Sequence, residues 1–427
     1  MSREALALYG GKKEIVKEFE NYQSIGEEEI KAVENVMRSK VLSKYIAGWG
    51  EDFNGGKKVK EFEEAWAKYF DVKHAITVNS WTSGLIAIIG AIGVEPGDEI
   101  IVSPWTMCAT ATAILHWNAI PVFADIEEKT FNLDPNEVKK KITGRTKAIL
   151  AVDIFGQSCD IEELRKIAKM HKLVLITDSA QSPGVWAEGK LTGTQSDIGG
   201  YSLNYHKHIH TGEGGVIVTN NDEYNIRVRM IRNHAEASIV KSRLNDLKNM
   251  IGYNFRLGEI ECAIGIEQLK KLNTLVVSRQ KAAKKLTDGL KELKGLVLPH
   301  IKQGNTHAYY MYPMILRPEI LGVKRELITK AIKAEGLDGI TNGYVNVHRL
   351  PIFQEKIAYG SKGYPWKGGL YNNEIDYAKG ICPVAEKLHD ETFIGFEMCL
   401  HQLNDDEVDK VIQVFKKVWD NIKYLEE

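Results

Sequence analysis

The stretch "HAITVNSWTSGLIAIIGAIG", residues 74–93, joins a short apolar run directly to a helical segment. Six further apolar runs follow it before residue 220, and most of the spacers between them have a helical pattern. They lie at 99–103, 121–125, 147–153, 174–178, 197–203 and 215–219. Strands that alternate with helices are typical of a largely parallel sheet that helices cover. The sequence therefore predicts an α/β fold, with a mostly parallel seven-stranded sheet flanked by helices in a large domain.

The pattern changes after about residue 275. "HAYYMYPMIL" and "KRELITKAIKAEG" indicate a smaller C-terminal α/β domain, and Asn404 with Glu407 forms a capping pattern before an amphipathic final helix. We therefore expect an N-terminal segment and large domain in residues 1–275 and a smaller domain in residues 276–427.

Composition narrows the class of function. Lys and Arg number 56 against 57 Asp and Glu, so the charge balance gives no reason to expect nucleic acid or an anionic membrane as a partner. The five cysteines are widely spaced and never form a C-x-x-C pair, which indicates reduced thiols. The longest apolar run is too short to cross a bilayer, and the first residues lack a signal-peptide core. We expect a soluble, cytoplasmic protein that acts on small molecules.

Chemistry is expected at the carboxyl ends of the parallel strands, where the loops converge. At the first such loop, Asn79, Ser80, Thr82 and Ser83 stand at the start of a helix. Backbone N–H groups, hydroxyls and the positive end of the helix dipole can together receive a phosphate there. Simple helix capping is the alternative interpretation.

Two later loops add charged groups. Asp178 ends the run 174–178 and Gln181 follows three residues later. A carboxylate at this place can bind a protonated ring nitrogen, although it could equally cap a helix. Lys207 lies in "YSLNYHKHIHTGEGG", residues 201–215, just before a glycine-rich turn. A lone lysine is most often solvated surface.

The histidines beside Lys207 raise a rival hypothesis. If the segment is extended, His206, His208 and His210 share one face and Lys207 points to the other. Three imidazoles at this spacing could hold a metal, but neither a carboxylate nor a cysteine lies beside them, and we expect no metal site. One of the histidines is expected to contact substrate or cofactor.

The three loops together indicate one cofactor. A phosphate socket, an acid for a pyridinium nitrogen and a lysine for an aldehyde are what pyridoxal 5'-phosphate requires. None of the three features is specific alone, but their order along the chain favours a pyridoxal phosphate enzyme.

Longer motifs also resemble a known family. "EFEEAWAKYF", "VEPGDEIIVSPWT", "DSAQSPG", "SLNYHKHIHTGEGGVIVTN" and "GYNFRLGEIECAIGIEQLKKL" occur in family order between about residues 20 and 275. They are similar to the DegT/StrS-type sugar aminotransferases among the fold-type I pyridoxal phosphate enzymes. The resemblance implies transfer of an amine from L-glutamate, or a similar amino acid, to a keto sugar that is expected to be nucleotide-linked. It also implies amino-sugar biosynthesis and a homodimer with shared active sites.

The resemblance assigns roles to individual residues. Lys207 stands at the Schiff-base lysine, Asp178 at the pyridinium contact and Gln181 at the contact to the ring hydroxyl. The positions of the phosphate contacts are taken by Thr82, Ser83, Ser202 and, from the neighbouring subunit, Asn254. Lys207 and Asp178 are thus the expected catalytic residues.

The chain also departs from the family pattern. Bulky Trp81 stands where the family usually has glycine, so the backbone path at the phosphate is an open question. Met107 occupies the usual position of the aromatic residue that stacks on the cofactor ring, and Trp105 lies two residues earlier. Met107 is expected to pack against the ring face, with Trp105 as the alternative.

Other functions remain open at this point. A cyclitol aminotransferase is similar in all these motifs and would differ only in the acceptor. Some relatives are sugar dehydratases with histidine in place of the lysine, and a regulator could keep the fold without turnover. Charge alone suggests five contacts to the acceptor: Arg232, His234, Arg256, His348 and Arg349.

Overall fold

The large domain is built on a seven-stranded sheet in a computed structural model that describes residues 3–242, 244 and 246–425. The strand order is β1-β9-β8-β5-β4-β2-β3. The strands are β1 (His74–Val78), β2 (Glu99–Val102), β3 (Ile120–Phe123), β4 (Thr146–Val152), β5 (Val174–Asp178), β8 (Ile198–Ser202) and β9 (Gly215–Thr219). All neighbouring strands are parallel except at β9, which runs antiparallel to β1 and β8. The predicted seven strands and the mostly parallel sheet are confirmed.

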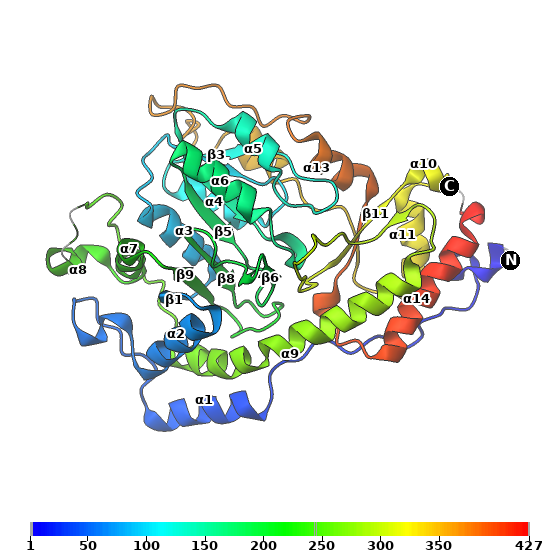
Figure 1. Cartoon of the computed structure of the whole chain (residues 1–427), viewed down its shortest axis with the longest axis horizontal. Helices are drawn as coiled ribbons and strands as arrows, with labels where there is room; N and C mark the ends of the chain where they lie inside the picture. Colours follow the sequence, from blue (N-terminus) through cyan, green and yellow to red (C-terminus); the bar gives the residue numbers. More distant parts are fainter. Residues whose placement is uncertain (1–2, 243, 245, 426–427) are drawn as a thin grey trace.

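Helices cover both faces of this sheet (Figure 1). The helices form two groups, one on each face of the sheet. Ile76 and Ile217 pack against the first group, whereas Ala75 and Val218, on the other face, pack against the second. The first group is α3 (Trp81–Ala91), α4 (Cys108–His116) and α7 (Asp222–Arg232), and the second is α2 (Lys57–Phe70), α5 (Pro135–Lys141), α6 (Ile161–His171) and α9 (Glu259–Leu290). Because side chains alternate between the faces of a strand, apolar residues at successive positions bury both faces.

The long helix α9 connects the two parts of the chain. It has 32 residues and extends from α2 in the large domain to α14 in the small domain, with α1 (Glu27–Ser39) beside it (Figure 1). Position 275, where we placed the domain boundary, lies inside this continuous helix. The division at that residue stays a prediction.

The smaller domain contains an antiparallel sheet with the order β10-β11-β13-β12. Its elements are β10 (Leu296–Val297), β11 (Tyr312–Leu316), β12 (Ile340–Asn342), β13 (Phe393–Phe396), α10 (Pro318–Leu321), α11 (Arg325–Ala334) and α14 (Asp405–Asp420). Asn404 and Glu407 form the predicted capping box, and the apolar stripe of α14 is buried. Leu6 and Ile15 of the N-terminal segment belong to the same core. This part of the chain is therefore α/β, as expected.

The segment between β12 and β13 returns to the large domain. Val347, Phe353 and Trp366 belong to the core that contains α3 and β2, and the Tyr377 hydroxyl donates to the Pro121 carbonyl over 2.8 Å. The remaining strands and α-helices are β6 (Trp186–Ala187), β7 (Lys190–Leu191), α8 (Ala235–Ser242), α12 (Pro351–Gln354) and α13 (Pro383–Lys387). Within the part of the chain that the structure describes, no helix combines the length and apolarity that a membrane span needs.

Candidate active site

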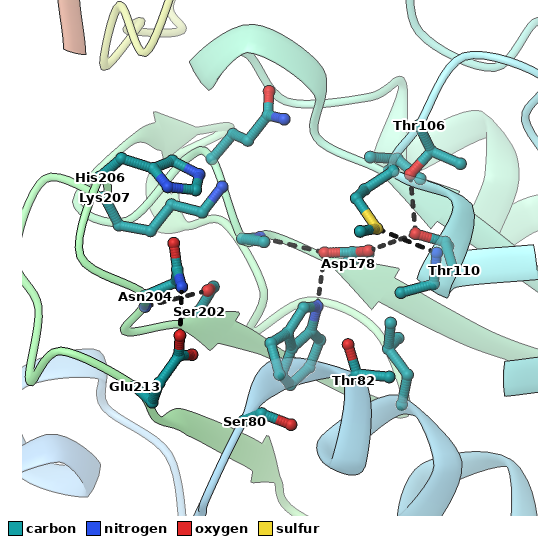
Figure 2. Close-up of a pocket in the computed structure, with 17 residues that line it drawn as sticks. Ser80, Thr82, Thr106, Thr110, Asp178, Ser202, Asn204, His206, Lys207 and Glu213 are labelled. Atoms are coloured by element: carbon teal, nitrogen blue, oxygen red, sulfur yellow. Dashed lines mark hydrogen bonds between the residues drawn. The ribbon is translucent and has the colours of Figure 1, made fainter. Parts of the chain in front are cut away.

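A cavity of about 210 Å³ lies at the carboxyl ends of β4, β5 and β8, beside the first turns of α3 and α4 (Figure 2). Six of the eight predicted site residues line it: Thr82, Met107, Asp178, Gln181, Ser202 and Lys207. Ser83 does not line the cavity, but its hydroxyl lies 2.9 Å from that of Ser80, which does. Asn254 does not line the cavity of its own chain. The cavity therefore brings together most of the residues that sequence reasoning selected.

Asp178 ends β5 and is 4% exposed. Its Oδ1 accepts from the Trp81 indole N–H over 2.7 Å and from the Ala180 backbone N–H over 3.2 Å, and Oδ2 accepts from the Thr110 hydroxyl over 2.9 Å. Burial raises the pKa of Asp178, while the bonds from Thr110, Trp81 and Ala180 and the charge of Lys207 oppose that rise. Two carboxylate oxygens offer about four acceptor sites, so Asp178 can accept one further N–H from the cavity.

Lys207 reaches the same cavity from the turn that follows β8, and Figure 2 shows its side chain pointing toward Asp178. Its Nζ lies 4.4 Å from the centroid of the Tyr310 ring. Burial lowers the pKa of Lys207 to about 8, although Asp178 and Cys399 act in the opposite direction. A buried amine with this pKa is partly neutral near physiological pH and can act as a nucleophile or base.

The first turn of α3 forms the opposite wall. The Ser80 hydroxyl caps the helix by accepting from the Ser83 backbone N–H over 3.1 Å. The N–H groups of Trp81 and Thr82 precede the first intrahelical bond and have no acceptor within the helix. Together with the Thr82 hydroxyl they form an anion site of the kind that helix starts provide.

Ser202 and Asn204 complete the wall beside Lys207 (Figure 2). The Ser202 hydroxyl accepts from the Asn204 backbone N–H over 3.2 Å, and the Asn204 amide donates to Glu213 over 2.9 Å. The Asn204 Oδ1 is buried and has no hydrogen-bond partner among the described residues. Sequence reasoning did not select Asn204 or Glu213, because their contact depends on how the intervening turn folds.

The three histidines would share one face only in an extended segment, and the structure does not have one there. β8 ends at Ser202, and the chain then turns, so His206 and Lys207 both line the cavity. His208 is buried, with Nε2 2.9 Å from the Ala308 carbonyl, and the backbone N–H of His210 donates to Gln268. The three histidines therefore have separate environments. Burial, followed by the charge of Lys207, lowers the pKa of His206 to about 4 and keeps its ring neutral.

Trp105, Met107 and Trp81 differ in their positions relative to the cavity. Trp105 is fully buried and its indole donates to Asn346 over 2.9 Å, whereas Met107 lines the cavity. Trp81 lies over β8, where a side chain at Gly200 would meet its ring at 2.5 Å. The glycine in β8 thus makes room for a tryptophan at the start of α3. No local sequence signal pairs residues 81 and 200.

Two of the five acceptor contacts suggested by charge are fully buried and bound to a carboxylate of their own chain. Arg232 is fully buried and donates to Glu63 over 2.7 Å, and His348 is buried with Nε2 3.0 Å from Glu386. These two suggestions were wrong because charge alone does not distinguish a buried ion pair from a binding residue. Neither His234, Arg256 nor Arg349 lines the cavity.

The residues present fit pyridoxal phosphate. The first turn of α3 can bind a phosphate, Asp178 keeps acceptor capacity for a ring N–H, and Lys207 offers an amine of lowered pKa. All three groups face one cavity. The donor set therefore matches the phosphate, ring nitrogen and aldehyde of that cofactor.

Comparisons with known proteins agree with this geometry. A model of the DegT/DnrJ/EryC1/StrS aminotransferase family matches residues 23–416. The GDP-perosamine synthase of Vibrio cholerae is 33% identical over 349 residues, which cover 79% of this chain and 91% of the synthase. The L-glutamine:scyllo-inosose aminotransferase of Streptomyces griseus is 30% identical over 431 residues, which cover 98% of each chain. The solved structure of Helicobacter pylori PseC, an aminotransferase involved in the biosynthesis of pseudoaminic acid, has 27% identity and a TM-score of 0.77. Its match covers 95% of this chain and 100% of that one.

Proposed function

Because this chain belongs to the DegT/DnrJ/EryC1/StrS aminotransferase family, we propose that it moves an amino group from L-glutamate to the ketone of a nucleotide-linked sugar. It is a pyridoxal-phosphate-dependent aminotransferase with the fold of the fold-type I enzymes, and its relatives include sugar aminotransferases. One observation carries the proposal furthest. The amine of Lys207, whose pKa is lowered to about 8, shares one cavity with buried Asp178 and the first turn of α3.

In this proposal, different residues of the chain bind the phosphate, the ring nitrogen and the ring of the cofactor. Thr82 and the free N–H groups of α3 bind the phosphate, with Ser202 on the opposite side. Asp178 accepts from the ring nitrogen and keeps it protonated. Gln181 and Met107 line the same cavity, and we assign Gln181 to the ring hydroxyl and Met107 to the face of the ring. When bound, pyridoxal phosphate supplies the electron sink that makes the amino acid's Cα–H acidic.

Lys207 carries the proton. Its neutral Nζ would remove the proton from the Cα of the amino donor and, in the same half-reaction, deliver it to the cofactor's C4′. For this it must lose its charge at working pH, and burial provides that change. His206 beside it is neutral, so it adds no further positive charge to the cavity.

An adjoining groove has room for a bulky acceptor. It has a volume of about 570 Å³ and shares Thr106 and Met107 with the cofactor cavity. Its far side is formed by residues 341–345, with Leu350 and His389. We place the acceptor ring there, because its ketone must approach the cofactor from open space beside Met107.

We also propose a homodimer in the cytoplasm. Exposed apolar side chains cluster before α2: Val41, Leu42, Ile46 and Trp49 are 43%, 47%, 58% and 38% exposed. This segment contacts residues close to Asn254. The Ile46 carbonyl accepts from the amide of Asn233, which pairs with Asn254 in a β-bridge, and the Leu42 carbonyl accepts from the backbone N–H of Glu259. A large exposed apolar patch favours a subunit contact. All five cysteines are free thiols, which suits the reducing cytoplasm.

A cyclitol ketone is the second candidate acceptor. The observation that favours it is the Streptomyces griseus relative, whose match covers 98% of both chains, against 79% and 91% for the perosamine synthase. The two proposals share every catalytic step and differ only in what fills the groove beside Met107.

Absorbance spectroscopy tests the proposal directly. The purified protein with pyridoxal phosphate should show a visible band that L-glutamate bleaches, and Lys207→Ala should lose the band and at least about 10²-fold of turnover. Lys166→Ala, on the exposed face of α6, is the matched control and should behave as wild type. A stable band that no amino acid discharges would favour the dehydratase or the regulator. Nucleotide-linked keto sugars and inososes, offered separately to the aminated enzyme, then identify the acceptor.

A further inference from the structure

Tyr310 belongs to the small domain and brings its ring against the active-site lysine. It lies two residues before β11, and the Nζ of Lys207 is 4.4 Å from the centroid of its ring. Tyr310 is half-buried and does not line the cofactor cavity, so it contacts the lysine from within the protein. The contact joins the two domains at the residue on which the proposed reaction depends.

The backbone around Tyr310 is held by the large domain and by the loop after β13. Its carbonyl accepts from the Cys399 backbone N–H over 3.0 Å, and the next N–H, that of Met311, donates to the Phe155 carbonyl over 3.3 Å. Gly156 has a φ of +102°, and a Cβ there would meet the Tyr310 nitrogen at 3.0 Å. Glycine lets this turn approach the backbone so closely. The start of the Tyr310 side chain is therefore fixed relative to the large domain.

Few groups near Lys207 can balance a positive charge on it. Within the described part of the chain, its Nζ has neither a hydrogen bond nor an ion pair, and the groups whose charge would act on it are Asp178 and Cys399. Burial raises the pKa of Cys399 to about 11, so the thiol is neutral at physiological pH. Burial also lowers the pKa of His206 and His208, and both rings are neutral. Of these four groups only Asp178 carries a charge, and in the proposed function it binds the ring nitrogen of the cofactor.

The proposed reaction makes Lys207 an ammonium for a short time. Its Nζ gains one proton from the Cα of the amino donor and gives one up at C4′, so it is charged between the two transfers and neutral before and after them. A buried charge without a partner is costly. A carboxylate beside Nζ would hold the proton too strongly for the second transfer. An aromatic face attracts an ammonium more weakly and takes no proton from it.

We propose that Tyr310 is a positioning residue whose ring face stabilises the Lys207 ammonium between the two proton transfers. This role rests on the proposed function, in which Lys207 carries the proton. The ring provides the attraction and the hydroxyl does not, since burial raises the pKa of Tyr310 and keeps the hydroxyl uncharged. Phenylalanine should therefore substitute for Tyr310, whereas leucine, which has no aromatic face, should not.

Capture of pyridoxal phosphate by the cofactor-free protein, followed by stopped-flow absorbance from pH 6 to 10, tests the contact without an amino donor. A ring that favours the ammonium raises the pKa of Lys207, so Tyr310→Leu should lower this pKa and speed capture at pH 7 about 3-fold. Tyr310→Phe should follow the wild-type profile. Tyr224→Leu removes a partly buried tyrosine ring from α7 and is the matched control, which should also follow it. A profile that stays unchanged in Tyr310→Leu, or that moves to higher pH, overturns the contact.

The half-reaction with the amino donor gives the second measurement. Tyr310→Leu should slow transfer of the α-proton of L-glutamate at least about 5-fold and increase the kinetic isotope effect of L-glutamate deuterated at Cα. General damage to the site would slow both capture and proton transfer, whereas the proposed role makes capture faster and transfer slower at pH 7. Equal transfer rates in Tyr310→Leu and Tyr310→Phe overturn the role. If L-glutamate and other amino acids leave the wild-type visible band unchanged, the proposed function fails, whereas identical capture profiles in wild type and Tyr310→Leu refute the Tyr310 contact alone.

Discussion

At the scale of single residues, the bond between Trp81 and Asp178 is the most informative contact of the site. The indole N–H supports the charged form of Asp178, which the cofactor's ring nitrogen requires. Trp81→Phe removes this donor and should raise the pKa of Asp178. The acid limb of the kcat/KM profile should then move to higher pH, with a loss on the order of 10-fold at pH 6.

Trp117 provides a matched control for that substitution. It is also 7% exposed, and its indole donates to the Ile86 carbonyl over 2.7 Å, away from the cavity. Trp117→Phe also replaces an indole by a phenyl ring and removes one hydrogen bond. It should therefore lower stability similarly and leave the acid limb of the kcat/KM profile unchanged. If both variants shift the limb equally, Trp81 has only a packing role.

Lys207 gives a prediction about pH. Its pKa lies near 8 in the folded protein, below the ordinary 10.5, because the buried cavity disfavours the ammonium. The neutral fraction, and hence the rate at which cofactor-free protein captures pyridoxal phosphate, should rise about 10-fold per pH unit below pH 8 and level off above it. Stopped-flow absorbance from pH 6 to 10 measures this. A rate that still climbs at pH 10 would show an ordinary lysine.

At the scale of elements, the first turn of α3 has two roles. Ser80 caps the helix, and the same turn presents its free N–H groups to the cavity. Ser80→Ala should cost about 1 kcal/mol of stability and also weaken binding of pyridoxal phosphate. Asn404→Ala removes the equivalent cap from α14, far from the cavity, and should cost the same stability without affecting the cofactor. Chemical denaturation and cofactor titration of both variants separate the two roles.

The elements themselves could be predicted from local sequence, but contacts between them could not. Apolar runs marked every strand of the large sheet, because buried strands need apolar residues on both faces. The same runs do not reveal direction, and β9 is antiparallel. The turn after β8 escaped prediction as well, since a strand pattern cannot show where pairing ends. Thr110 was missed because its bond to Asp178 joins residues 68 positions apart.

At the scale of the whole molecule, a change in residue composition does not by itself locate the boundary between two domains, because one helix can continue through it. A change in the residue pattern near residue 275 predicts a boundary, and α9 continues through that position to Leu290. Leu6 and Ile15, at the opposite end of the chain, help to form the core of the small domain. Long-range packing of this kind leaves no local signal in the sequence.

Subunit complementation tests the proposed shared sites. Asn254 does not line its own cavity, and its Oδ1 accepts from its own Arg256, so we propose that it serves the partner's cofactor phosphate. Lys207→Ala and Asn254→Ala should each be nearly inactive as homodimers. When the two are mixed and allowed to exchange, half of the dimers become mixed, and each mixed dimer contains one intact site and one doubly altered site. Activity should therefore recover to about a quarter of the wild-type value. If Asn254 instead acted within its own chain, both sites of every mixed dimer would be defective and mixing would restore nothing.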